Sequence, residues 1–182
     1  MGSKQKNSIT VTLTATFAAL YAAGVFFLAP ISFQLFQVRI ADALLPLAIL
    51  FGWPAVVGLS IGAFVANFFG DLGPVDMVGG AIANFIATLL AWRIAQYRSR
   101  SWKLLGVLVE VVVVTLIVGS YLSYLFNQPL LVGWLGVLLG STTAIGVLGS
   151  ALLFAMSNRR VAGLLGSHGL RLQTSSRESQ SQ

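Results

Sequence analysis

The sequence predicts an all-α, integral membrane bundle of six helices with both chain termini in the cytoplasm. Hydrophobic residues make up 57% of the 182 residues and charged residues only 9%, which is too little polar surface to cover a water-soluble globule. Apolar runs long enough to cross a bilayer recur along the chain. Basic residues are clustered between these runs, as is typical of cytoplasmic loops.

Helices are expected over residues 9–29, 40–52, 54–70, 75–96, 104–126 and 130–156. Four of these segments approach or exceed the length of about 20 residues that spans hydrocarbon. The apolar stretch from Ile40 to Phe69 is too long for one span and short for two. We place a turn within it at Trp53 and Pro54, because proline disfavours the helical conformation in the residue before it and lacks a backbone donor.

The positions of the basic residues favour six helices over five. With six helices and cytoplasmic termini, ten of the eleven lysines and arginines lie on the cytoplasmic side and only Arg39 lies outside. The basic clusters therefore indicate topology and contact with membrane lipid; no nucleic-acid partner is expected. Residues 1–156 are expected to form one transmembrane domain. Residues 157–182 are rich in Ser, Gln and Arg without periodicity, which predicts a flexible cytosolic tail.

Polar side chains in the apolar helices are the candidates for a substrate site, because an ionised group facing hydrocarbon costs at least about 2.5–3.5 kcal/mol. Arg39 and Asp42 are three residues apart and would share a helical face. Asp76, Gly80 and Asn84 descend at four-residue steps, which would place a carboxylate above an amide with a gap between them. The substrate-binding candidates are Arg39, Asp42, Asn67, Asp76, Asn84 and Glu110.

Structural roles stay open for most of these residues. Asp71 and Asp76 flank a turn at Gly73-Pro74, where aspartate commonly forms turns or caps helices. Arg39 and Asp42 would also suit an interfacial ion pair, and asparagines bond across membrane helices. Tyr121, near the outer end of its helix, is expected in an interfacial aromatic belt.

Glu110 lies deeper, about two helical turns from the cytoplasmic end of its helix and between valines. A carboxyl group at this depth needs a partner or a proton. It could reach the floor of a cavity or meet another subunit, and the sequence leaves both open.

Small residues recur at four-residue spacing on three helices. Ala15, Ala19 and Ala23 give the first helix a smooth face, Gly58, Gly62 and Ala66 form a similar stripe on the third, and Gly136 and Gly140 form one on the sixth. Such patterns let helix backbones approach closely in lipid. They are typical of packing within a bundle, and the alanine face is also suited to docking another protein.

Several chemistries lack the residues they need. The sequence contains no cysteine, one histidine and no G-x-x-x-x-G-K-[ST] phosphate loop, so we expect no metal or cofactor in this chain and no ATP hydrolysis by it. Binding or transport is the economical interpretation, and the chain is not expected to be an enzyme. A metal-dependent intramembrane enzyme using Asp71 and Asp76 with magnesium or calcium and a structural subunit without a ligand remain as alternatives.

Specific strings then point to a family. LAPISF at 28–33, QVRIADAL at 37–44, GDLGPVD at 70–76 and IVGSYLSYL at 117–125 resemble the QueT family of queuosine-precursor transporters. Members are the S components of energy-coupling factor (ECF) transporters in the prokaryotic cytoplasmic membrane. The resemblance implies six helices and capture of a 7-deazaguanine-type base from outside.

The resemblance also implies partners: a transmembrane T component and two cytosolic ATPases that hydrolyse ATP. S components of this kind dock through an A-x-x-x-A pattern, which Ala15, Ala19 and Ala23 match. The chain departs from the family at Asp42, where glutamate is usual, and at Ser141, where glutamate is often found. An S component for another vitamin or nucleobase therefore remains an alternative.

Overall fold

The computed structural model describes residues 3–28, 39–70, 72–97 and 99–158, and the secondary structure of these ranges is helical. The elements in chain order are α1 (Ser3–Phe27), the 3-10 helix η1 (Ile40–Leu47), α3 (Ala48–Phe51), α4 (Trp53–Phe68), α5 (Pro74–Ile94), the 3-10 turn η2 (Ala95–Tyr97), α6 (Arg100–Leu125), α7 (Leu130–Ser141), the π-helix η3 (Thr142–Gly149) and α8 (Ser150–Met156). The segments expected to be helical are helical within the described residues, although the first helix begins at Ser3 instead of residue 9 and the segment expected at 40–52 is mostly the 3-10 helix η1.

Four helical segments are long and apolar enough to cross a membrane: Asn7–Phe27, Pro74–Ile94, Arg100–Leu125 and Leu130–Met156. The last of these joins α7, η3 and α8 into one continuous rod. Two shorter apolar helices, Ile40–Phe51 and Trp53–Phe68, lie between the first and second segments. The chain is therefore a multi-pass membrane protein.

The break between the two short helices lies at Gly52, one residue before the turn expected at Trp53 and Pro54. Gly52 has φ 66° and ψ −139°, a conformation that suits glycine because side chains with a Cβ clash there. Trp53 and Pro54 are instead the first residues of α4. Proline fits at this position because its missing N–H would have no partner inside the helix.

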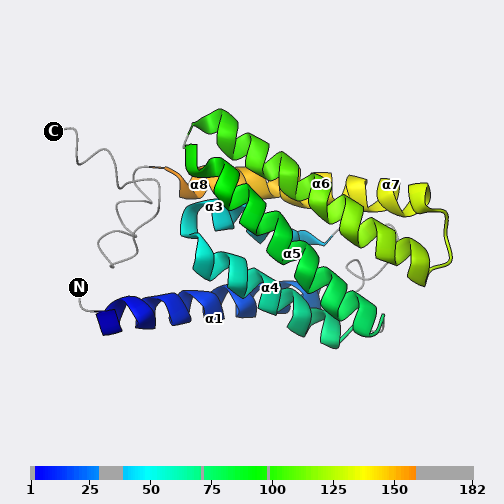
Figure 1. The fold of residues 1–182 in the computed structure, drawn as a ribbon, viewed down its shortest axis with the longest axis horizontal. Helices are drawn as coiled ribbons and strands as arrows, with labels where there is room; N and C mark the ends of the chain where they lie inside the picture. Colours follow the sequence, from blue (N-terminus) through cyan, green and yellow to red (C-terminus); the bar gives the residue numbers. More distant parts are fainter. Residues whose placement is uncertain (1–2, 29–38, 71, 98, 159–182) are drawn as a thin grey trace.

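α1 packs along α4 through the small residues of α4 (Figure 1). A Cβ atom at Gly58 would lie 2.5 Å from the Thr14 carbonyl oxygen, and one at Gly62 would lie 2.7 Å from that of Ala18. The two backbones thus approach more closely than larger residues would allow. The glycine stripe predicted for bundle packing performs that role, and it buries the α1 face that carries Phe17 and Tyr21.

The start of α1 and the end of α8 lie at the same end of the bundle, together with the connection from α5 to α6 (Figure 1). Lys103 Nζ donates a hydrogen bond of 3.3 Å to Ser157 Oγ, which ties the start of α6 to the residue after α8. Arg93 and Arg100 belong to the same end of the molecule. Of the predicted tail, residues 159–182 lie outside the described residues.

Candidate functional site

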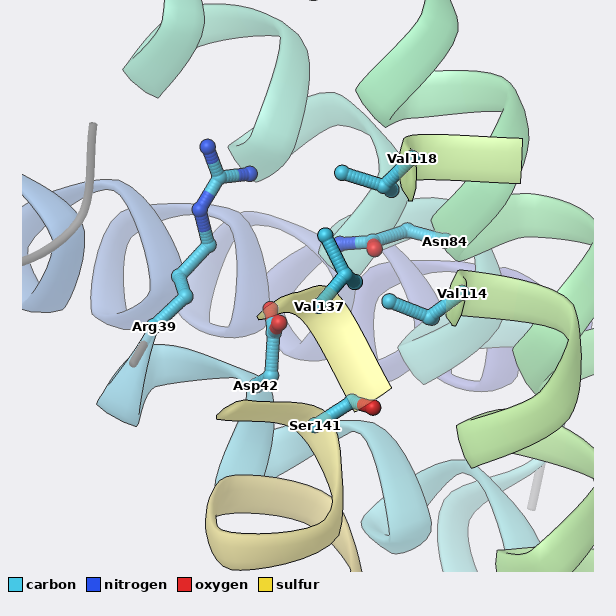
Figure 2. Close-up of a pocket in the computed structure, with 7 residues that line it drawn as sticks. All are labelled: Arg39, Asp42, Asn84, Val114, Val118, Val137 and Ser141. Atoms are coloured by element: carbon cyan, nitrogen blue, oxygen red, sulfur yellow. The ribbon is translucent and has the colours of Figure 1, made fainter. Parts of the chain in front are cut away.

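A small polar cavity lies between η1, α5, α6 and α7 (Figure 2). Its lining comprises Arg39, Asp42, Asn84, Val114, Val118, Val137 and Ser141. Its volume of about 10 Å³ is close to the minimum that holds one water molecule. The three valines supply apolar walls, and the other four side chains supply hydrogen-bonding groups around them.

Asp42 is the acidic group of this cavity and is held by a tyrosine from another helix. It lies on η1, is 6% exposed, and its Oδ1 accepts a hydrogen bond of 2.5 Å from the hydroxyl of Tyr21 on α1. Tyr21 is fully buried and is not among the candidates that the sequence singles out. The available signal is its spacing: Phe17, Tyr21 and Val25 form the buried stripe of α1.

Arg39 brings positive charge to the cavity, although not from a helix. It precedes η1 with φ −83° and ψ 87°, so the expectation that Arg39 and Asp42 share a helical face is wrong. In Figure 2 both side chains point to the same side, and the guanidinium of Arg39 extends beyond the Asp42 carboxylate. Arg39 also interacts electrostatically with Asp76, so its charge acts on two carboxylates.

Asn84 lies on α5, lines the cavity and is 3% exposed. Its Nδ2 donates a long hydrogen bond of 3.4 Å to the Leu59 carbonyl oxygen on α4. Asn84 therefore makes the interhelical hydrogen bond expected of a structural asparagine and also lines the cavity.

Asn67 and Asp76 form a separate buried group. Asn67 Nδ2 donates to the Asp76 carbonyl oxygen at 2.8 Å, and the Tyr121 hydroxyl donates to Asp76 Oδ1 at 2.7 Å. A Cβ at Gly80 would lie 2.4 Å from Asn67 Nδ2, so the open gap expected between Asp76 and Asn84 is filled by Asn67. Tyr121 likewise binds a carboxylate inside the bundle, beyond the belt position expected for it.

The aspartates do not assemble a metal centre in the part of the chain that is described. No cluster of three or more His, Cys, Asp or Glu side chains occurs there. Asp71 lies outside the described residues. The N-cap of α5 is Gly73, and the Asp76 carboxylate bonds to Tyr121 as a link between α5 and α6.

Glu110 is fully buried on α6, so contact with another subunit does not fit its position. Neither of its carboxyl oxygens has a hydrogen-bond partner among the described residues. Glu110 does not line the cavity. It lies one helical turn before Val114, which does line the cavity. Asp42 acts on it electrostatically.

Ala15, Ala19 and Ala23 are all exposed on α1. Packing within the bundle is therefore not their role in this chain, since the buried stripe of α1 is a different one. Next to them, an apolar groove between α1 and α4 is lined by Ala22, Ala23, Phe26, Phe27, Val65, Ala66 and Phe69.

A helical membrane bundle that encloses converging polar side chains around a cavity is the arrangement expected of a protein that binds or carries a small polar molecule. The chain matches the family model described as QueT transporter over residues 11–158. It belongs to this family, and the resemblance noted in its sequence is confirmed. Searches of curated proteins and of solved structures found no match. A transporter family implies transport as the role of this chain.

Proposed function

We propose that this chain is the S component of an ECF-type transporter and captures a queuosine or archaeosine precursor, a 7-deazaguanine-type base, from outside the cell. The observation that carries the proposal is the cavity with valine walls and polar edges. A planar heteroaromatic ring fits between apolar side chains, while its edge needs hydrogen-bonding partners. Asp42 supplies acceptors, Arg39 donors, and Asn84 both.

A base is many times larger than a cavity of about 10 Å³, so binding must move the cavity walls apart. The walls belong to elements that are separate in sequence, with Asp42 on η1 and Val137 on α7. Asn67, Asp76 and Tyr121 join α4, α5 and α6 beside the cavity. In our proposal they support the site, and Arg39, Asp42 and Asn84 contact the base.

The proposed partners are a T component and two cytosolic ATPases, with this chain in the cytoplasmic membrane of a prokaryote. The exposed alanines of α1 support docking, because three small side chains on one outward face let a partner helix approach closely. The shared position of the α1 start and the α8 end (Figure 1) supports an even number of crossings. We infer six crossings with both termini in the cytoplasm.

An S component for another vitamin or base is the second candidate, and one observation favours it. Asp42 and Ser141, the two positions at which the family resemblance implies a departure, both line the cavity. Removing a carboxylate from one wall and shortening another would change which hydrogen-bond donors the site accepts.

The test is calorimetric titration of the purified chain in detergent with a panel of deazapurines and vitamins. We expect binding of a 7-deazaguanine without ATP or metal, weakened by Asp42→Asn and unaffected by Thr16→Ala, which removes an exposed hydroxyl that bonds within α1. Binding of a different vitamin would support the second candidate. Metal-dependent turnover would support the enzyme, and no binding to any compound would leave a structural subunit.

A further inference from the structure

The position of Glu110 relates it to the cavity without making it part of the lining. Glu110, Val114 and Val118 follow at four-residue steps on α6 and therefore lie on one helical face. Val114 and Val118 form one wall of the cavity. Glu110 is thus the next side chain on that face, one turn deeper towards the end where α6 begins.

The other direction along this face is closed by apolar packing. A Cβ at Gly106 would lie 3.1 Å from the Ala91 carbonyl oxygen and 3.2 Å from Ile49 Cδ1. This packing offers no side-chain donor below Glu110. On the cavity side lies Asp42, the charged group that acts on Glu110 electrostatically.

Both Glu110 oxygens remain without a hydrogen bond among the residues of the described ranges. A fully buried polar atom without a partner is uncommon and calls for a ligand, a water molecule or a proton. Two other polar side chains at this level already pair with each other, since Thr115 Oγ1 and Ser141 Oγ are 3.1 Å apart. Asn67 Oδ1 and Asp76 Oδ2 are also buried without a partner, but each of those side chains makes another hydrogen bond, whereas both oxygens of Glu110 are unpaired among the described residues.

We propose that Glu110 is a specificity-determining residue that accepts hydrogen bonds from the innermost edge of the bound molecule once the walls have separated. Two carboxyl oxygens match two adjacent N–H donors, so the ligand class is a base that carries an exocyclic amine beside a ring N–H. Asp42, on the opposite wall and already bonded to Tyr21, borders the same edge. This inference rests on the proposed function of base capture.

The first experiment compares 7-deazaguanine with 7-deazahypoxanthine, which lacks only the exocyclic amine, by calorimetry. The wild-type chain should bind the amine-bearing base at least about tenfold more tightly, because an acceptor built for an N–H is left unpaired by the analogue. Glu110→Gln, which replaces one acceptor oxygen with a donor, should reduce this ratio to about threefold or less. Ser123→Ala, which removes a buried hydroxyl elsewhere on α6, should leave it unchanged.

The outcomes separate this inference from the function on which it rests. If the wild-type chain binds neither base, the proposed function fails and the role of Glu110 fails with it. If the wild-type chain binds and Glu110→Gln keeps the full ratio, only the role of Glu110 is overturned.

A second measurement needs no substitution in the cavity. Glu110 and Glu178 are the two glutamates of the sequence, so carbon-13 labelling of glutamate carboxyl groups gives two resonances, which Glu178→Gln assigns. Addition of 7-deazaguanine should shift the Glu110 resonance and leave that of Glu178 in place. A Glu110 resonance that does not move at saturating base would contradict the proposal even if Glu110→Gln fails to fold.

Discussion

The two sides of α1 differ in what they touch. On one side Phe17, Tyr21 and Val25 are buried, and the Tyr21 hydroxyl bonds to the acidic group of the cavity. On the other side Ala15, Ala19 and Ala23 face outward. A single helix thus borders the candidate binding site on one face and the surroundings of the protein on the other.

The difference shows that small residues have two separate uses in this chain. Gly58 and Gly62 of α4 bring α1 and α4 together, whereas Ala15, Ala19 and Ala23 of α1 are exposed. In the apolar span of α1, 17% of the residues are buried, against 39–44% in the other three spans. Lipid accommodates long apolar side chains as readily as alanine, so three outward alanines are better explained by close approach of another helix.

The largest effect is expected from a substitution on the outward face of α1, which should block uptake without loss of binding. Ala19→Trp places a bulky ring on the outward face, which prevents close approach of a partner helix. Uptake of labelled base into cells should fall to background while calorimetric affinity stays within about twofold. Val112→Trp, at an exposed site on α6, is the control and should leave uptake intact. Normal uptake by Ala19→Trp would refute docking through this face.

The inward side should show the opposite pattern. Asp42→Asn keeps the size of the side chain but removes the negative charge beside Arg39. Hydrogen bonds to charged groups contribute about 1.5–3 kcal/mol, so affinity for the base should fall by about 12- to 140-fold. Copurification with the proposed T component should be unchanged, and its loss would contradict the division of roles between the two sides of α1.

Gly62→Leu should displace α1 from α4 and so affect both the inward and the outward face of α1. A side chain there meets the Ala18 carbonyl oxygen and Tyr21 Cβ, which lie 2.7 and 2.9 Å from the Cβ position. Overpacking of this kind costs about 1–3 kcal/mol, which should lower the melting temperature in detergent and weaken binding. Ile61→Leu, at an exposed neighbour on α4, serves as the control. Equal melting temperatures for the two variants would argue against the tight α1–α4 contact.

The smallest effect is expected from Tyr21→Phe, which removes one hydrogen bond to Asp42 and keeps the aromatic ring. A hydrogen bond of this kind contributes about 0.5–1.5 kcal/mol, equivalent to about 2- to 12-fold in affinity. Tyr124→Phe, at a residue that is 78% exposed, should have no effect in the same titration. An affinity equal to that of the wild type would show that the Tyr21 hydroxyl does not position Asp42 for binding.

The helices could be predicted because hydrophobic length and proline act locally along the chain. The break between the two short helices lies at Gly52, one residue before the predicted turn, because glycine tolerates the positive φ that the break requires. Arg39, Asp42 and Asn84 could be selected because polar groups in apolar helices need a reason to be there.

The partners of these groups could not be predicted, because they depend on how the helices are rotated against each other. In a soluble helix the apolar face reveals that rotation, but here both faces of each span are apolar. Nothing in the sequence around Tyr121 distinguishes an interfacial ring from one that bonds to Asp76. For the same reason the spacing of Asp76, Gly80 and Asn84 predicted an open gap that Asn67 in fact fills.

The π-helix η3 sets the rotational phase of everything that follows it. Its wider turns hold an additional residue relative to an α-helix, and each residue of an α-helix accounts for about 100° of rotation. If residues 142–149 formed a regular α-helix of the same length, α8 would turn by about that angle, and Leu153, fully buried on α8, would face lipid. Deleting one residue between Thr142 and Gly149 would remove the additional residue and keep the rotational phase, so Leu153 would stay buried and Ser141 would keep its place in the cavity wall.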